Sequence, residues 1–434
     1  MSASPRVYLH TLGCPKNEAD SNSLERRLSR LGVSLAAEAA QATHIVVNTC
    51  GFIQDAKEES IAAILEAVSA FPRTPVLVMG CLVERYRAEL ETGIPEVAGW
   101  FGLSETDALI TALGRTRPAA ITAGLVLPGA YGYVKISDGC DHLCSFCAIP
   151  AIKGPYAALP VKDILAQATS YLDAGARELV LVGQDTAIWR DGHTGLAELV
   201  GLLGGDERLW RIRLMYLQPE HVGDDLLELV AEHPKVVPYL DIPFQHASRR
   251  LLARMGRKGD AVQYLALLDR ARRVMPDVSL RSTFIVGFPG ETEADFQALL
   301  DFVTEAGFDH AGAFLFSPEE GTAAAHLRPR VRPEVARERL ARLSDILVTV
   351  SEVRIARLLG TRVEVLVDAV GDIDGPAGVR AVGRTGGQAP EVDGVTYLER
   401  SLPPGTARGD RVPALVTGAL GYDLVARWDA AQPS

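Results

Sequence analysis

Short apolar runs alternate with amphipathic helical stretches over residues 1–125. Three of these runs have the length of buried strands, and a helical pattern follows each of them: residues 7–12, 44–49 and 76–79. The first helix should pass through Leu24, Leu28 and Leu31, and its candidate caps are Asp20-Ser21 and Ser23. Because strands and helices alternate, this segment is predicted to form a parallel sheet.

The alternation continues over residues 126–358, after a linker or turn expected at residues 128–132. Six further strand candidates occur there, with helical patterns between them: residues 133–137, 178–182, 211–217, 238–242, 280–286 and 311–316. A closed βα barrel needs eight such units, so these units predict an incomplete barrel. A charged helical stretch, residues 332–353, is expected to lead to the last domain.

Helical periodicity stops after that stretch. Short β-rich runs follow, separated by glycine, proline and aspartate turns: residues 362–367, 379–382, 395–398 and 412–416. This pattern predicts a small antiparallel β-barrel. The fold class is therefore α/β, with a parallel-sheet domain at 1–125, a partial βα barrel at 126–358 and a β-barrel at 359–434.

Composition and charge indicate the cellular environment of the protein and the kind of partner that it binds. No apolar run approaches the ~18 residues that span a membrane, and the start of the chain lacks the apolar core of a signal peptide. Six cysteines are too few for a disulfide scaffold in 434 residues, which favours a reducing cytoplasm. The net charge is −11, and from Thr361 onward seven arginines and ten acidic residues leave −3. Direct nucleic-acid binding is therefore not expected, and a basic protein partner fits better.

Three cysteines lie close together on one short stretch, Cys140, Cys144 and Cys147, with the spacing Cys-x3-Cys-x2-Cys. Three thiolates on a tight loop can hold three irons of a cubane cluster and leave the fourth iron open. There are two alternatives to a cluster: a zinc site that His142 completes, and a chance crowding of cysteines. Zinc sites usually bring cysteines in Cys-x2-Cys pairs, so the spacing favours the cluster.

Each of the other three cysteines, Cys14, Cys50 and Cys81, follows one of the predicted N-terminal strands. The carboxyl ends of parallel strands share one edge of a sheet, so these residues can converge on one site. Each could instead be a small buried core residue, as cysteine often is. Their shared position favours a second iron–sulfur cluster, again with three protein ligands.

The Cys-x3-Cys-x2-Cys spacing resembles that of the radical S-adenosylmethionine (SAM) superfamily. The resemblance implies a six-stranded partial barrel, SAM bound at the open iron, and cleavage of SAM to a 5′-deoxyadenosyl radical. It implies SAM contacts at strand ends and beside the third cysteine: Phe146, Gln184, Gln245, Gly287 and Glu291. A helix-start carboxylate favoured by the helix dipole is the alternative for Glu291. No catalytic residue beyond the cluster ligands is predicted.

With a second, dispersed cysteine triad, the chain resembles the methylthiotransferases. Leu-Gly-Cys-Pro-Lys-Asn at 12–17 and Asn-Thr-Cys-Gly-Phe-Ile at 48–53 are similar to the RimO branch, and the last domain is similar to a TRAM domain. The resemblance implies two 4Fe–4S clusters, SAM as radical source and methyl donor, and an electron-donor protein. The implied reaction inserts a methylthio group at the β-carbon of an aspartate in ribosomal protein S-12, free or in the small subunit.

Two other functions remain open at this stage. The sister MiaB branch modifies adenosine in transfer RNA and usually carries Gly-Cys-Gln-Met-Asn at the first cysteine. A non-catalytic scaffold in which the cysteines hold zinc is the alternative of another class. Glu319 and Glu320 could form an acid/base pair, but a solvated loop is the favoured interpretation.

Overall fold

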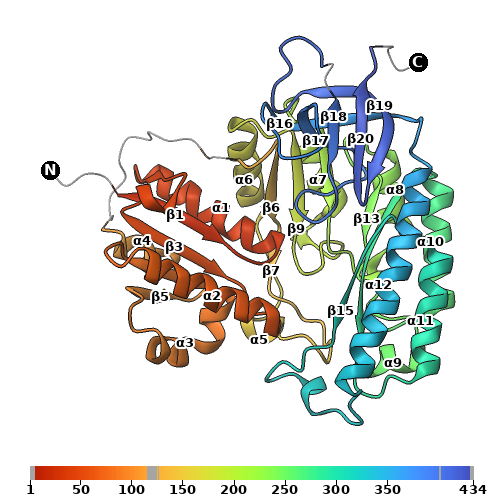
Figure 1. Cartoon of the computed structure of the whole chain (residues 1–434), viewed down its shortest axis with the longest axis horizontal. Coiled ribbons are helices and arrows are strands. Elements are labelled where there is room, and N and C mark those ends of the chain that lie inside the picture. The colour runs from red at the N-terminus through yellow and green to blue at the C-terminus, as the bar shows by residue number, and fades with distance from the viewer. Residues whose placement is uncertain (1–4, 115–124, 126, 400–401, 431–434) are drawn as a thin grey trace.

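The computed structural model describes residues 5–114, 125, 127–399 and 402–430. The chain forms three domains that follow one another in the sequence (Figure 1). The N-terminal sheet domain lies on the left of that view, the parallel-stranded barrel domain in the centre, and the C-terminal β-barrel at the top.

The N-terminal domain is a five-stranded parallel sheet in the order β2-β1-β3-β4-β5. Its strands are β1 (Arg6–Thr11), β2 (Ser34–Leu35), β3 (His44–Thr49), β4 (Val76–Gly80) and β5 (Gly99–Phe101). Its helices are α1 (Pro15–Arg30), α2 (Gln54–Ala70), α3 (Cys81–Gly93) and α4 (Thr106–Ala112), with a 3-10 turn, η1 (Ala39–Gln41). The parallel sheet is confirmed; β2 and β5 were not predicted because two or three residues carry no readable periodicity.

The predicted caps of the first helix are wrong. Helix α1 begins at Pro15, whose fixed φ and missing N–H suit the first helical position. Asp20 and Ser21 therefore lie inside the helix, where their side chains reach other elements. Ser21 Oγ accepts a hydrogen bond from Asn48 Nδ2 at 2.9 Å, and Asp20 Oδ2 lies 3.1 Å from Lys153 Nζ.

The central domain contains the six predicted parallel strands. They are β6 (Tyr131–Lys135), β9 (Glu178–Val182), β12 (Arg211–Leu214), β13 (Tyr239–Asp241), β14 (Ser279–Val286) and β15 (His310–Leu315). They pair as β6-β9-β12 and β13-β14-β15. Backbone hydrogen bonds from Val237 N to Ile212 O and from Leu217 N to Asp241 O, both 2.9 Å, join the two halves into one curved sheet. The partial barrel is confirmed, but Tyr131 and Gly132 belong to β6, so the linker expected at 128–132 is two residues too long.

Helices cover the outside of this barrel. They are α6 (Val161–Asp173), α7 (Leu196–Gly204), α8 (Asp224–Glu232), α9 (Arg249–Arg254), α10 (Ala261–Val274), α11 (Glu293–Ala306) and α12 (Pro333–Ala356). Shorter elements lie in the connections: β7 (Ser137–Asp138), α5 (Ile149–Lys153), β8 (Ala157–Ala158), β10 (Arg190–Asp191), β11 (Thr194–Gly195), η2 (Pro219–His221) and η3 (Ala323–His326).

Helix α1 packs against the barrel domain beside β6 (Figure 1). Its Ala19 joins a buried cluster with Tyr133 of β6 and Val180 of β9. Ala389, from a loop of the C-terminal domain, enters the same cluster. The core of the barrel is therefore completed by both neighbouring domains, and α1 is fixed with Cys14 at its start.

The C-terminal domain is a closed barrel in the order β16-β17-β18-β20-β19. Its strands are β16 (Arg362–Val370), β17 (Val379–Arg384), β18 (Thr396–Glu399), β19 (Arg411–Leu420) and β20 (Asp423–Trp428). Each neighbouring pair is antiparallel except β18 and β20, which run parallel. The predicted barrel is confirmed, with β20 as an additional strand.

The two predicted domain boundaries stay predictions. The boundary at 358/359 lies between α12, which ends at Ala356, and β16, which begins at Arg362. The boundary at 125/126 adjoins residues 115–124 and 126, which lie outside the described residues. Among the described residues, no helix combines the length and the apolar character needed to cross a membrane.

Candidate iron–sulfur and SAM site

The three N-terminal cysteines, called the N-terminal triad, are Cys14, Cys50 and Cys81. Cys14 caps α1 after β1, Cys50 directly follows β3, and Cys81 is the first residue of α3 after β4. A Cβ on Gly13 would lie 2.7 Å from the Cys50 Cβ, so the approach of the first two loops requires glycine, which here has φ +99°. Cys81 Sγ lies 3.9 Å from Oδ1 of Asn17 in the first turn of α1. The predicted convergence at one sheet edge is confirmed.

The other three cysteines, called the loop triad, are Cys140, Cys144 and Cys147, between β7 and α5. Ser145 fixes the loop, since its backbone N–H donates to Met255 O at 2.9 Å and its hydroxyl to Arg254 O at 2.8 Å. The loop is thereby held at the carboxyl end of the barrel strands, where βα folds place their active sites.

The two triads lie next to each other where the N-terminal and barrel domains meet. Cys81 of the N-terminal triad packs with Ala148 and Ile152 in one buried cluster. Ala148 directly follows Cys147 of the loop triad, and Ile152 lies on α5. A ligand between the triads would therefore contact both domains.

All six cysteines are free thiols. Burial raises the pKa of Cys81 to about 12 and that of Cys147 to about 12, and it also raises the pKa of Cys50 and Cys140. Such thiols are protonated at neutral pH in the bare protein and lose the proton only to a bound cation. Two groups of three buried or half-buried thiols at adjoining strand ends fit cubane clusters, which are held by thiolates.

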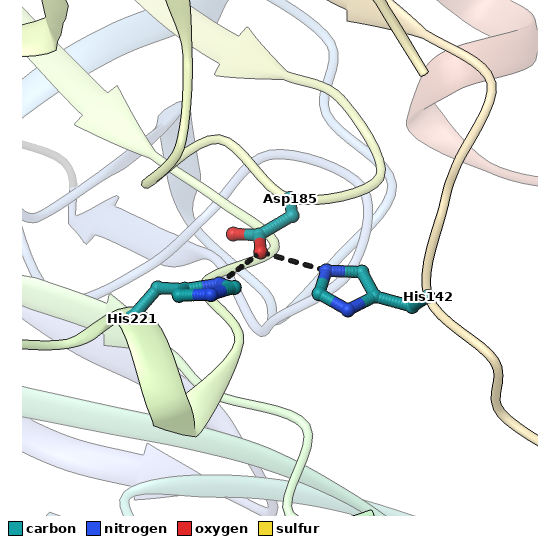
Figure 2. A group of neighbouring side chains, drawn as sticks. All are labelled: His142, Asp185 and His221. Atoms are coloured by element: carbon teal, nitrogen blue, oxygen red, sulfur yellow. Dashed lines mark hydrogen bonds and ion pairs between the residues drawn. The ribbon is translucent and has the colours of Figure 1, made fainter. Parts of the chain in front are cut away.

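In the described residues, neither cysteine triad brings its three sulfur atoms within 4.8 Å of one another. Two thiolates on one zinc can lie no more than about 4.6 Å apart, given Zn–S bonds of ~2.3 Å. In the part of the chain that the structure describes, the group of three metal-ligand side chains with atoms within 4.8 Å of one another contains no cysteine. It consists of His142, Asp185 and His221 (Figure 2).

His142 is oriented by a carboxylate. Asp185 Oδ2 lies 2.9 Å from His142 Nε2 and 2.6 Å from His221 Nδ1 (Figure 2). The hydrogen bond to Asp185 raises the pKa of His142. His142 thus ties the cluster loop to the residue that follows Gln184 after β9, and its imidazole is engaged there and not by the cysteines.

The first three predicted SAM residues lie around this end of the barrel. Phe146 is half-buried and packs against the barrel core. Gln184, just after β9, accepts a hydrogen bond from Lys16 Nζ at 3.4 Å. Gln245 follows β13 with φ +69°, and its backbone pairs with Thr283 and Ile285 of β14. A non-glycine residue in that conformation is uncommon and is often found at ligand sites.

Gly287 and Glu291 shape the loop after β14. Gly287 has φ +77°, and a Cβ there would lie 2.8 Å from Ala336 Cβ, so the close neighbour that requires glycine is helix α12. Its N–H donates to the Glu291 carboxylate, which also lies 3.5 Å from Arg339 Nη1. The Glu291 side chain has no exposed surface, and its hydrogen bond with Gly287 stabilises the buried side of the loop. Direct contacts of Gly287 and Glu291 with SAM stay predictions.

One polar group at this end of the barrel fits a ligand. Gln218 donates its backbone N–H to Asp185 Oδ1 at 3.4 Å, and its buried side-chain oxygen has no hydrogen-bond partner among the described residues. A buried acceptor without a partner is costly, and a ligand that brings hydrogen-bond donors would satisfy it. SAM carries such donors on its amino group and its ribose.

Comparisons with known proteins agree with this geometry. Residues 134–303 match the Radical SAM superfamily, residues 6–102 match the Uncharacterized protein family UPF0004, and residues 359–428 match the TRAM domain. The chain is 42% identical to the ribosomal protein uS12 methylthiotransferase RimO of Thermus thermophilus, over 96% of this chain and 98% of the relative. It is 40% identical to the RimO of Moorella thermoacetica, over 92% of this chain and 94% of the relative.

The chain belongs to the RimO methylthiotransferase family. Its fold is also similar to that of the radical SAM methyltransferase TsrM from Kitasatospora setae, with a TM-score of 0.56 and 14% identity over 80% of this chain and 89% of the other. The predicted radical SAM and TRAM architecture is confirmed, and family membership implies SAM and two 4Fe–4S clusters as cofactors.

The sequence did not single out several residues that approach the triads in this RimO-family chain. Arg257 Nη1 lies 3.7 Å from Cys144 Sγ. Tyr216, just after β12, has φ +62°, and its ring lies 3.6 Å from Lys16 Nζ. Lys16 was visible only as part of a family-like motif. Neither Arg257 nor Tyr216 has a pattern in its neighbourhood that would have revealed these contacts.

The interpretation of Glu319 and Glu320 as a solvated loop is wrong for Glu319. Its side chain is 3% exposed, and Oε2 lies 2.9 Å from Lys57 Nζ of α2 and 2.8 Å from Arg85 Nη1 of α3. Burial alone would raise the pKa of Glu319, but hydrogen bonds from Ser317, Arg85 and Lys57 outweigh it and hold the pKa below its usual value. Glu319 therefore anchors the N-terminal domain to the loop after β15.

Replacement of Glu319 by glutamine should weaken this docking by about 1–3 kcal/mol, because two half-buried cations lose their carboxylate. Glu320→Gln is the matched control: Glu320 is exposed in the same loop, so its loss should change stability by less than about 0.5 kcal/mol. Because the folded pKa is lowered, the contribution of Glu319 is complete above its unfolded pKa and fades as pH falls towards the folded value. Hydrogen exchange in α2 and α3 measures it, and equal protection in both variants would contradict the anchor.

Proposed function

We propose that this chain inserts a methylthio group at the β-carbon of an aspartate in ribosomal protein S-12. The names of its RimO relatives give this ribosomal protein as their substrate. The N-terminal triad binds one 4Fe–4S cluster, and the loop triad binds the second together with SAM. The observation that carries this proposal is the packing of Cys81 against Ala148 and Ile152. This contact brings the N-terminal triad next to the loop triad.

The chain's residues position the reactants. When bound, the reduced loop cluster and SAM supply a 5′-deoxyadenosyl radical, which can remove hydrogen from an unactivated carbon. Ser145 and His142 hold the cluster loop at the barrel end. Gln184, Gln245 and the side-chain oxygen of Gln218, which has no partner among the described residues, would orient SAM. Arg257 provides a cation beside Cys144, where a cluster-bound sulfur would carry negative charge.

The aspartate β-carbon explains why the chain uses two clusters. Its C–H bond has no acidic proton, so a side-chain base could not activate it. Consistent with this, the buried carboxylates Glu291 and Glu319 are held in structural pairs with arginine and lysine. A site with two cysteine triads can separate radical formation from sulfur supply.

Partner preference follows from charge. The C-terminal barrel is acidic from sequence and is a poor phosphate binder, which favours a basic protein substrate. An electron-donor protein, a cytoplasmic location and the lack of direct nucleic-acid binding remain predictions.

The proposal predicts that S-12 from a strain lacking this gene loses its methylthio-aspartate, whereas tRNA methylthiolation is unchanged. Mass analysis of both molecules from the deletion and parent strains measures this. Persistence of the S-12 modification together with loss of a tRNA methylthio group would show that the substrate is tRNA. Anaerobic purification adds a separate check, since zinc without labile sulfide would rule out radical chemistry.

A further inference from the structure

Lys16 links the helix that follows Cys14 to the barrel domain. It occupies the first turn of α1, two residues after Cys14, and its Nζ reaches Gln184 Oε1 of the barrel domain at 3.4 Å. Gln184 directly precedes Asp185, which lies 2.9 Å from Nε2 of His142 on the loop that carries the second triad. The ammonium therefore lies where the N-terminal domain meets the barrel end that carries the loop triad.

Lys16 has only neutral partners among the described residues. Its Nζ contacts an amide oxygen and lies 3.6 Å above the ring of Tyr216. A tyrosine phenol carries no charge at neutral pH, so Tyr216 cannot serve as a counter-ion. By contrast, Lys57 at the same domain seam has the carboxylate of Glu319 at 2.9 Å, and Lys153 has that of Asp20 at 3.1 Å.

The surroundings of Lys16 are built to hold it in place. Tyr216 is fixed by a hydrogen bond from its backbone N–H to Asp241 Oδ2 at 3.0 Å, in an uncommon conformation for a non-glycine residue. An aromatic face positions an ammonium group without neutralising it. An ammonium group has three donors. Among the described residues only one of them has a hydrogen-bond acceptor, so the others can serve a ligand.

We propose that Lys16 binds the side-chain carboxylate of the substrate aspartate, and so selects that residue and places its β-carbon between the triads. This inference rests on the proposed function. The β-carbon is bonded directly to the carboxyl carbon, so a cation that holds the carboxylate also restrains the reacting carbon. SAM carries the same chemistry in its methionyl carboxylate, and the experiment separates the two sources.

The test is a binding cycle with holoenzyme containing both clusters, without reductant so that no turnover occurs. Wild type and Lys16→Met are each titrated with S-12 and with S-12 in which the target aspartate is asparagine. Wild type should bind the aspartate form about tenfold to a hundredfold more tightly, the range of a charge-assisted hydrogen bond. Lys16→Met should bind both forms with the affinity that wild type shows for the asparagine form.

Two further variants serve as controls. Lys16→Arg keeps the charge and should keep a preference for aspartate. Lys162→Met removes an exposed lysine of α6 and should behave as wild type. Iron and sulfide contents establish that each variant carries its clusters.

Equal losses for both substrates in Lys16→Met, or no preference in wild type, would overturn the inference. So would loss of SAM cleavage by reduced Lys16→Met in the absence of S-12, because Lys16 would then serve the SAM carboxylate. Failure of the proposed function has a different signature: wild type would not methylthiolate S-12 at all. If wild type methylthiolates S-12 but binds its aspartate and asparagine forms equally well, only the role of Lys16 is rejected.

Discussion

Replacement of Cys144 by alanine is expected to abolish reductive cleavage of SAM, whereas replacement of Cys50 should leave cleavage intact and stop methylthio transfer. The two cysteines lie on separate elements, the loop before α5 and the end of β3. Each triad has only three cysteines, so the loss of one ligand should remove one cluster and leave the other. Iron per chain should fall from about eight to about four in either variant.

Cys50 is the better probe of the N-terminal triad because Cys81 packs directly on α5. A Cys81 variant could disturb the loop cluster by removing a contact with Ala148, which would mix the two roles. Deoxyadenosine formation and methylthio transfer are measured on the same anaerobic preparations, with cluster spectra as the control for folding. If Cys50→Ala lost SAM cleavage while the loop cluster spectrum persisted, the division of labour would be disproved.

The sequence was sufficient to predict the convergence of Cys14, Cys50 and Cys81. Strand and helix periodicity located each cysteine after a strand, and parallel strands bring such positions to one edge. The loop triad was readable from spacing alone. What periodicity could not provide was the packing of Cys81 on Ala148, which sets the distance between the two sites.

Long-range ion pairs account for most of what the sequence did not reveal. Glu319 has the local pattern of a solvated loop, and only folding brings it to Lys57 and Arg85, more than 230 residues earlier in the chain. Asp20 similarly has the local pattern of a helix cap. Its ion-pair partners, Lys135 and Lys153, belong to another domain and could not be recognised from that pattern. A local sequence pattern reports on secondary structure and not on which charges meet at a domain seam.

A buried ion network joins the C-terminal barrel to the central domain. Glu178, the first residue of β9, has no exposed side-chain surface. Its carboxylate lies 3.0 Å from Arg211 Nε, 2.8 Å from Arg213 Nε and 2.6 Å from Arg384 Nη1. Arg384 comes from β17 of the C-terminal barrel and also pairs with Asp368 at 2.7 Å. Burial alone would raise the pKa of Glu178, but the three arginines hold it far below its usual value.

Glu178→Ala should destabilise the protein by about 3–5 kcal/mol, because three buried guanidinium groups lose their shared carboxylate. Glu178→Gln should cost less, since an amide oxygen still accepts a hydrogen bond. The matched control is Glu364→Ala, which removes an exposed partner of Arg411 and should cost no more than about 1 kcal/mol. Thermal unfolding and hydrogen exchange in β16 and β17 measure these differences.

The location of the network makes a second readout possible. Glu178 is the first residue of β9, and Gln184 follows the carboxyl end of this strand. The ion network therefore lies at one end of the barrel and the cysteine triads lie near the other end. Loosening the C-terminal barrel should therefore reduce protection in β16 and β17 while iron and sulfide contents stay at the wild-type level. Unchanged protection in Glu178→Ala would mean that the network does not hold the domains together. Loss of iron in a folded Glu178→Ala variant would mean that the two ends of the barrel are coupled.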